Sequence, residues 1–221
     1  MKLARFVATA PGRSLRIRDA SPGDVSGIAH VMTEASASAY AHLPESAVWL
    51  PRVLASMALR MPAVYEERLG EIGHRRAAHR VLVAETSDNR IAGLIDIGVR
   101  DDGAGQLYAW HVPPEFHGRA IAEIGPTVGN ALMAAALDHL GAVDVYSNTT
   151  VGTVGLRAHQ KQGFEIDDSV PADDPRLSIP ARWVEAGCPS TIVLPDGTVA
   201  DVGRQVILIR RCPSGIGSSG A

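Results

Sequence analysis

Residues 112–122 read Val-Pro-Pro-Glu-Phe-His-Gly-Arg-Ala-Ile-Ala, and this stretch decides the fold that we expect. It follows a short apolar segment at 106–112 and precedes a helical pattern that ends at Leu140. A loop of small residues that enters a helix leaves backbone N–H groups free, and the helix dipole adds positive potential there. Such a loop suits a pyrophosphate, because larger side chains would hold the phosphate away from the backbone.

Strands are predicted on both sides of this stretch. Residues 14–19 alternate between apolar and polar side chains, which is typical of a half-buried strand. Three apolar runs separated by turn residues predict an antiparallel meander; they are 80–85, 91–99 and 106–112. Later runs predict further strands at 143–146, 164–166 and 206–209, and a hairpin at 191–194 and 198–202.

Helices are predicted from capping residues and helical spacing. Ser21-Pro22-Gly23-Asp24 combines a capping serine, a proline at the first helical position and an acid at the third, so a helix begins there. Pro51 and Pro62 interrupt the next helical region, which predicts two short pieces at about 48–59 and 65–72 with a bend between them. The helices that end at Leu140 and Gln162 are each followed by a glycine.

The order of these elements is β-α-α-β-β-β-α-β-α-β-β. The connection from 106–112 through a helix to 143–146 requires parallel neighbours, whereas the meander is antiparallel. We therefore expect an α/β fold with a mixed sheet and helices on both faces. One domain should span residues 1–212, with an insertion at 167–190 that shapes the substrate site, and 213–221 should be a disordered tail.

Composition excludes several function classes. The 221 residues carry a net charge of −3, which argues against nucleic-acid binding driven by electrostatics. No segment approaches the ~20 apolar residues of a membrane span, and the N-terminus lacks the apolar stretch of a signal peptide. Cys188 and Cys212 form neither a disulfide framework nor a metal-ligand pattern. We expect a cytoplasmic protein without a metal.

The order of elements and the 112–122 stretch resemble the GCN5-related N-acetyltransferase (GNAT) superfamily. That family has Val-x-Pro at the end of its fourth strand, followed by Arg/Gln-x-x-Gly-x-Gly/Ala around the pyrophosphate of coenzyme A. Its later motif, Asn-x-x-Ala-x-x-x-Tyr-x-x-x-Gly-Phe, corresponds to residues 152–164. The resemblance covers about 15–164 and the final strand. It implies transfer of an acetyl group from acetyl-CoA to a primary amine of a small molecule or peptide.

Two registers of the pyrophosphate loop stay open. In the first, 117–122, His117 stands at the Arg/Gln position and Ala120 at the central glycine. In the second, 124–129, small residues lead into the helix, and Pro126 favours a helix that begins there. Over both registers the resemblance implies a set of coenzyme A-binding residues, namely Trp110, His111, Val112, His117, Gly118, Arg119, Ala120, Ala122, Gly125, Thr127, Gly129, Asn130 and Asn148.

Catalytic candidates follow from the same resemblance. The family often carries a carboxylate on its fourth strand, and 106–112 has none, so His111 and Asp96 are candidate bases and Tyr108 is a further polar candidate. His159 stands where the family carries a tyrosine that donates a proton to the departing thiolate. With an unperturbed pKa of about 6.5, a useful fraction of its imidazole would be protonated near neutral pH.

Two functions remain open at this point. The first is a catalytic N-acetyltransferase. The second is a degenerate relative that binds acyl-CoA or a protein partner without turnover, which the departures at His117, Ala120 and Gly152 favour. The sequence does not identify the acceptor or say whether the chain forms a homodimer.

Overall fold

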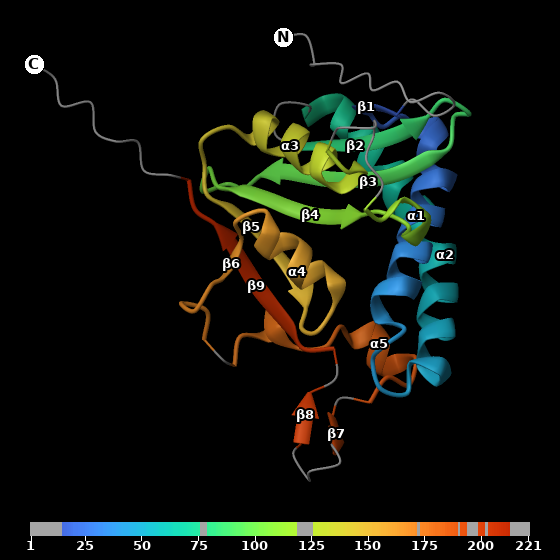
Figure 1. The fold of residues 1–221 in the computed structure, drawn as a ribbon, viewed down its shortest axis with the longest axis vertical. Helices are drawn as coiled ribbons and strands as arrows, with labels where there is room; N and C mark the ends of the chain where they lie inside the picture. Colours follow the sequence, from blue (N-terminus) through green and yellow to red (C-terminus); the bar gives the residue numbers. More distant parts are fainter. Residues whose placement is uncertain are drawn as a thin grey trace, which may run out of the picture.

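The computed structural model describes residues 15–75, 79–118, 126–171, 173–189, 191–193, 199–201 and 203–212. Its centre is a seven-stranded mixed sheet in the order β1-β2-β3-β4-β5-β9-β6 (Figure 1). The strands are β1 (Leu15–Asp19), β2 (His79–Thr86), β3 (Ile91–Val99), β4 (Gly105–His111), β5 (Val145–Thr150), β6 (Glu165–Ile166) and β9 (Gln205–Arg210). A separate antiparallel pair consists of β7 (Thr191–Val193) and β8 (Val199–Asp201).

The predicted meander and crossover are confirmed. Strands β1 to β4 pair antiparallel in succession, and β4 pairs parallel with β5. Strand β9 then inserts between β5 and β6 and is antiparallel to both. The α/β fold with a mixed sheet is therefore observed as expected.

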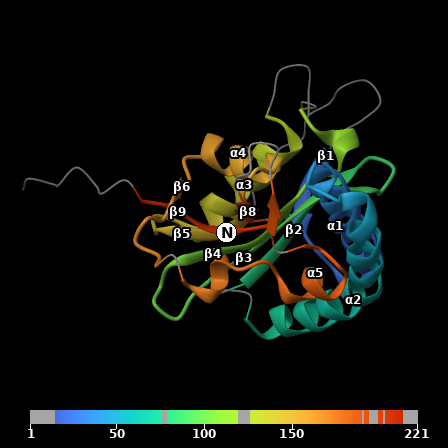
Figure 2. The same cartoon turned by 90° about the horizontal axis from the view of Figure 1, so that it is seen from below.

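Five helices surround the sheet in the described part of the chain: α1 (Val25–Tyr40), α2 (Ser46–Arg75), α3 (Val128–Leu140), α4 (Val154–Lys161) and α5 (Ala181–Glu185). Short 3-10 turns lie at η1 (Pro22–Asp24), η2 (Pro114–Phe116) and η3 (Pro175–Leu177). Helices α3 and α4 cover one face of the sheet, and α1, α2 and α5 cover the other (Figure 2). Each face has its own apolar core, so the sheet is buried on both sides.

The start of α1 is the capping arrangement that the sequence predicts. The Ser21 backbone N–H donates to Asp24 Oδ2 at 2.7 Å, and Pro22 opens the 3-10 turn that leads into the helix. The predicted end of α3 is also observed. Gly141 follows its last residue with a φ of 75°, a conformation that favours glycine.

The prediction of two short helices around Pro51 and Pro62 is wrong. Helix α2 is one continuous helix of 30 residues that contains both prolines. Its buried side chains recur every four residues on either side of Pro62, at Trp49, Val53 and Met57 and again at Tyr65 and Leu69. Both prolines lie off this stripe, so packing of the stripe against the neighbouring core holds the helix together despite the lost hydrogen bonds.

One further prediction needs correction. Strand β5 begins later and extends further than 143–146, because pairing with β9 holds a polar segment, 147–150, in the sheet. The insertion at 167–190, predicted to shape the substrate site, contains η3 and the five-residue α5. Its Trp183 is 2% exposed and packs in the core beside Trp49, so the insertion contributes to the fold as well as to the cavity wall.

The predicted tail at 213–221 lies outside the described residues. None of the described helices combines the length and apolarity needed to cross a membrane.

Candidate active site

The site lies where β4 and β5 separate. These parallel strands pair only at Gly105 with Val145 and at Gln106 with Tyr146. Beyond these pairs the two strands diverge, as Figure 1 shows. Residues 108–111 of β4 therefore have no described strand paired with the edge that faces β5. A cavity of about 900 Å³ opens in this gap. Its size is that of a small-molecule site, and one of its walls is an unpaired strand edge with free backbone groups.

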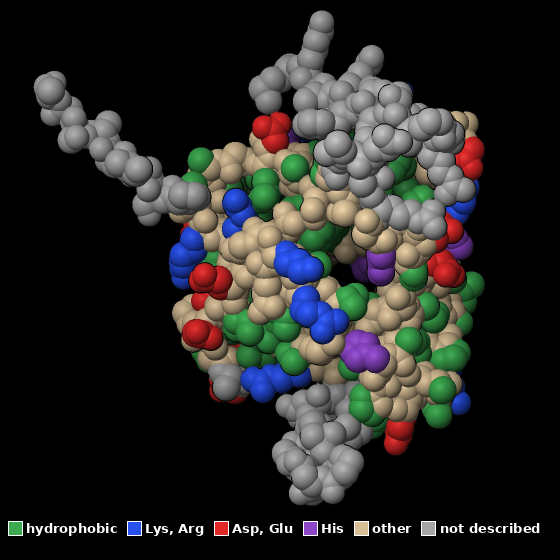
Figure 3. Space-filling model, in the orientation of Figure 1, with side chains coloured by type: hydrophobic (Ala, Val, Ile, Leu, Met, Phe, Trp, Pro, Cys, Tyr) green, Lys and Arg blue, Asp and Glu red, His purple; other side chains and the backbone are tan. Residues whose placement is uncertain are grey.

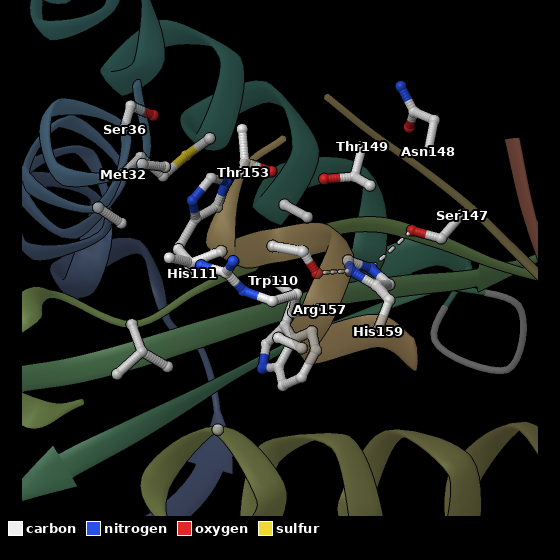
Figure 4. Close-up of a pocket in the computed structure, with 18 of the residues that line it drawn as sticks. Met32, Ser36, Trp110, His111, Ser147, Asn148, Thr149, Thr153, Arg157 and His159 are labelled. Atoms are coloured by element: carbon white, nitrogen blue, oxygen red, sulfur yellow. Dashed lines mark hydrogen bonds between the residues drawn. The ribbon is translucent and has the colours of Figure 1, made fainter. Parts of the chain in front are cut away.

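The cavity connects several elements. From the N-terminus of α3 it passes along the ends of β4 and β5 and the inner face of α4, and it reaches α1, α2 and the insertion. Among its lining residues are Trp110, His111, Ser147, Asn148, Arg157 and His159 (Figure 4).

One end of the cavity is the N-terminus of α3. Thr127 caps the helix, and its hydroxyl oxygen accepts the Asn130 backbone N–H at 3.3 Å. Gly129 lies against the indole of Trp110, since a Cβ at this position would come within 3.3 Å of Trp110 Cζ2. Among the described residues, the buried Trp110 Nε1–H has no hydrogen-bond partner. The free backbone N–H groups of a helix N-terminus are suited to bind an oxyanion.

The loop before α3 is described only at its start. The ring Nε2 of His117 lies 2.8 Å from the Val112 carbonyl oxygen, to which it donates, and Gly118 turns the chain with a φ of 64°. Four residues assigned to the pyrophosphate loop lie outside the described residues, namely Arg119, Ala120, Ala122 and Gly125. Helix α3 begins at Val128, which confirms the helix start predicted from Pro126. The choice between the two registers stays a prediction.

His111 lies at the end of β4, in the middle of the cavity. It pairs with Leu94 of β3, whose side chain belongs to the core under α1 and α2, so His111 faces that side of the sheet. Burial, with a smaller contribution from the neighbouring His159, lowers the pKa of His111 to about 4, and Asp96 acts in the opposite direction. The imidazole is therefore neutral near pH 7 and has a nitrogen that can accept a proton.

His159 of α4 is 6% exposed, and both of its ring nitrogens are engaged. Nδ1 donates to the Gly155 carbonyl oxygen at 2.8 Å, and this leaves Nε2 as the acceptor for the Ser147 hydroxyl at 3.0 Å (Figure 4). Trp110 and Phe164 pack edge-on against the ring. Burial lowers the pKa of His159, so a smaller fraction of its imidazole is protonated near neutral pH than its ordinary pKa implies.

Sequence reasoning missed Ser147. It is 3% exposed on β5, and its contact with His159 joins β5 to α4. Serine is a common residue on strands, so nothing in the sequence marked this one. Only the packing of α4 on β5 brings the two side chains together.

Asp96 does not line the cavity. It is fully buried on β3 and binds three partners from α2 and β2. Arg68 and the Tyr65 hydroxyl donate to Oδ2, and His79 Nε2 lies 2.6 Å from Oδ1. These contacts occupy the carboxylate and tie α2 to the sheet. The geometry thus favours His111 over Asp96 as the base.

Tyr108 lies at a bulge in the β3–β4 pairing and is 45% exposed. Its ring stacks on that of His79, with the centroids 5.1 Å apart, and the Arg68 guanidinium lies 5.3 Å from its centroid. Tyr108 lines the cavity, so it stays a polar candidate at the edge of the site.

Helix α4 presents two cations to the cavity, Arg157 and Lys161. Neither has an acidic partner among the described residues. Lys161 precedes Gln162, whose amide Nε2 donates to Asn130 Oδ1 at 3.0 Å and so ties this end of α4 to the first turn of α3. Lys161 therefore adds positive charge at the anion-binding end of the cavity. In the described part of the chain, no group of three or more His, Cys, Asp and Glu side chains is placed to hold a metal ion.

Comparison with known proteins supports the fold. No protein-family model matches the chain, and no curated protein sequence matches it. Among solved structures, PaiA N-acetyltransferase from Thermoplasma acidophilum, in complex with coenzyme A, is 16% identical with a TM-score of 0.61, covering 90% of this chain and 99% of that one. Ribosomal-protein-S5-alanine acetyltransferase from Vibrio fischeri is 11% identical with a TM-score of 0.53, covering 90% and 94%. A protein from Desulfovibrio desulfuricans assigned to the GNAT acetyltransferases is 15% identical with a TM-score of 0.51, covering 90% and 99%.

Proposed function

We propose that this chain, which has the fold of the GNAT acetyltransferases, transfers an acetyl group from acetyl-CoA to a primary amine. One observation carries the proposal. The cavity between β4 and β5 runs from a helix N-terminus, with its free backbone N–H groups, to a pair of histidines, His111 and His159. A long ligand with phosphates at one end and a reactive group at the other matches this layout.

The described residues fit coenzyme A. The first turn of α3 offers the backbone N–H groups of Thr127 and Gly129 to the pyrophosphate, while the Thr127 hydroxyl holds that of Asn130, and Lys161 adds a positive charge. The unpaired edge of β4 offers backbone groups to the amides of the pantetheine arm. The small side chain at Gly129 keeps this entrance open next to Trp110. Asn148, exposed on β5, lies along the same path.

His111 is the proposed general base. It is neutral near pH 7 and lies at the end of β4, next to the place where the thioester carbonyl would lie. When the amine attacks that carbonyl, a C–N bond forms, and the ammonium proton passes to the imidazole directly or through water. Backbone N–H groups at the end of β4 stabilise the negative charge that develops on the carbonyl oxygen.

His159 remains the proposed proton donor to the departing thiolate. In the free protein its Nε2 is an acceptor, so it must first receive a proton, and the one that the reaction supplies is the ammonium proton taken up at His111 and passed on through water. The lowered pKa then makes its imidazolium form a stronger acid than ordinary histidine. The C–S bond breaks, and the thiolate takes this proton. Ser147 holds the ring in place from β5, which makes it a positioning residue.

A second function has specific support. Both ring nitrogens of His159 are already hydrogen-bonded, and the described lining contains no carboxylate base. A chain that binds acyl-CoA without turnover would tolerate both features. The two functions share coenzyme A binding and differ in whether acyl transfer follows.

An assay with a panel of amines separates them. Purified protein is mixed with acetyl-CoA and each amine, and released thiol and acetylated amine are both measured. Catalysis predicts both products, and His111→Asn should lower kcat by about 10²-fold or more. The exposed Arg60→Gln, on α2 away from the cavity, should leave kcat unchanged. Binding of coenzyme A without thiol release for any amine would support the second function.

The cytoplasmic location also stays a proposal. It is supported by Cys188, which is a buried thiol rather than half of a disulfide.

A further inference from the structure

The charges on the cavity wall have one sign. The described lining residues include three cations, Arg157, Lys161 and Arg176. No Asp or Glu is among the described lining residues. Figure 3 shows the same bias on one face: Lys, Arg and His side chains lie beside the hollow over α4, while Asp and Glu side chains lie toward the edges. A ligand with several positive charges would meet no compensating charge in such a cavity.

The carboxylates closest to the cavity are already engaged. Asp96 is fully buried on β3, the neighbour of β4, and binds Arg68 and His79. Asp174 of the insertion pairs with Arg176 at 2.6 Å, which neutralises that cation. Both carboxylates are occupied by protein cations and are unavailable to an incoming ammonium group.

Arg157 and Lys161 face different parts of the cavity. They are four residues apart on α4, so Arg157 lies roughly 6 Å nearer the start of the helix. The other end of α4 is tied to α3 through Gln162, so Lys161 belongs to the anion-binding end of the cavity. Arg157 and His111 both line the cavity, and in Figure 4 both side chains point into it. Arg157 is thus a cation without an acidic partner in the described chain, in the same cavity as the proposed base.

Beyond His111 the wall is mainly apolar. Helix α1 contributes Met32, Ala35 and Ala39, α2 contributes Met57 and the insertion contributes Trp183, and the same elements add the hydroxyl groups of Ser36, Tyr40 and Ser178. The acceptor end therefore combines one unpaired cation with an apolar surface. A complementary acceptor has a negative group for the cation and an apolar group for the wall.

We infer that the amine acceptor is a small monoamine with a carboxylate and an apolar side group, such as an apolar α-amino acid, and that Arg157 binds the carboxylate. This inference rests on the proposed acetyl transfer. It excludes polyamines and lysine-rich peptides as preferred acceptors, because the described residues of the cavity wall offer them no negative charge.

The test compares matched acceptors with acetyl-CoA as the donor. We measure kcat/KM for L-leucine, L-leucine methyl ester and spermidine. The ester keeps the amine and the apolar group but lacks the carboxylate, and its amine is less basic, so more of it is unprotonated at a given pH. A preference for leucine therefore cannot arise from the supply of free amine. We expect leucine to exceed the ester and spermidine by roughly tenfold to a hundredfold, the range of a charge-assisted hydrogen bond.

Variants assign the preference to Arg157. Arg157→Gln should reduce the ratio of leucine to ester to within about threefold of unity, while its dissociation constant for coenzyme A stays within about threefold of the parent value. Lys161→Gln should weaken coenzyme A and keep the ratio, and Arg60→Gln should change neither. The inference is overturned if spermidine or the ester is used as well as leucine, or if Arg157→Gln weakens coenzyme A and keeps the ratio. If no amine of a wider panel is acetylated, the proposed function fails and this inference fails with it.

Discussion

The pKa of His111 predicts how stability depends on pH. In the folded protein it falls from 6.5 to about 4, chiefly because the cavity wall shields the ring from solvent. Between these two values the unfolded chain binds more protons than the folded chain, so stability rises with pH in this window. The unfolding free energy therefore decreases as pH falls from about 6.5 toward 4. The change His111→Asn removes the titrating group and should remove this part of the pH dependence.

The magnitude follows from the size of the shift. The two pKa values of His111 differ by about 2.5 units, which corresponds to about 3 kcal/mol at the acid limit. The ring is half-buried rather than fully enclosed, so solvent screening reduces the effect. We expect the unfolding free energy of the parent to fall by about 1–2 kcal/mol more than that of His111→Asn between pH 8 and pH 5.

Urea denaturation at pH 5, 6, 7 and 8 measures both free energies. Comparing parent and variant cancels the titration of shared groups that do not interact with His111. His30→Asn is the matched control, because His30 is exposed on α1 and does not line the cavity. Equal pH dependence in the parent and His111→Asn would show that His111 titrates normally in the folded protein, and the argument for a neutral base at the cavity would then lose its support.

Three other predictions concern the cavity. His159→Ala should lower kcat by at least about tenfold, and Ser147→Ala should lower it by less. Both variants should bind coenzyme A with nearly the parental affinity. If His159→Ala turns over at the parental rate across pH 6–9, His159 takes no part in proton transfer. Gly129→Val should weaken coenzyme A binding by about tenfold or more and lower the unfolding free energy by about 1–3 kcal/mol, because even a Cβ at this position lies 3.3 Å from Trp110. Parental affinity in calorimetry would contradict the placement of the pyrophosphate. Trp183→Ala should lower the unfolding free energy by about 3–5 kcal/mol in urea titrations, because it removes a buried side chain from the core. A loss of less than about 1 kcal/mol would show that the insertion only lines the cavity.

Periodicity and turn chemistry predicted most of the fold. Local patterns can be recognised from the sequence. Examples are the apolar runs of β2, β3 and β4 and the capping residues Ser21 and Gly141. Helix α2 was misjudged because a local rule about proline competes with a stripe of buried side chains, and only tertiary packing decides between them. The extent of β5 was underestimated for a similar reason, since its polar residues lie in the sheet through pairing with β9.

The site was predictable where residues coincide with a motif. His111 and His159 were identified from their places after the fourth strand and in the α4 motif, and both line the cavity. Asp96 was a candidate because it lies on the neighbouring strand, but the sequence could not show that Arg68 of α2 would occupy its carboxylate. The contribution of Arg157 depends on how α4 packs against the ends of β4 and β5, which no local pattern encodes.

The most direct test of the account is a crystal structure of the protein with coenzyme A bound. The account predicts that the pantetheine arm lies between β4 and β5 along 108–111, with the pyrophosphate at the first turn of α3 near Gly129 and the sulfur close to His111 and His159. Coenzyme A bound outside this gap, or no binding at millimolar concentration, would contradict it.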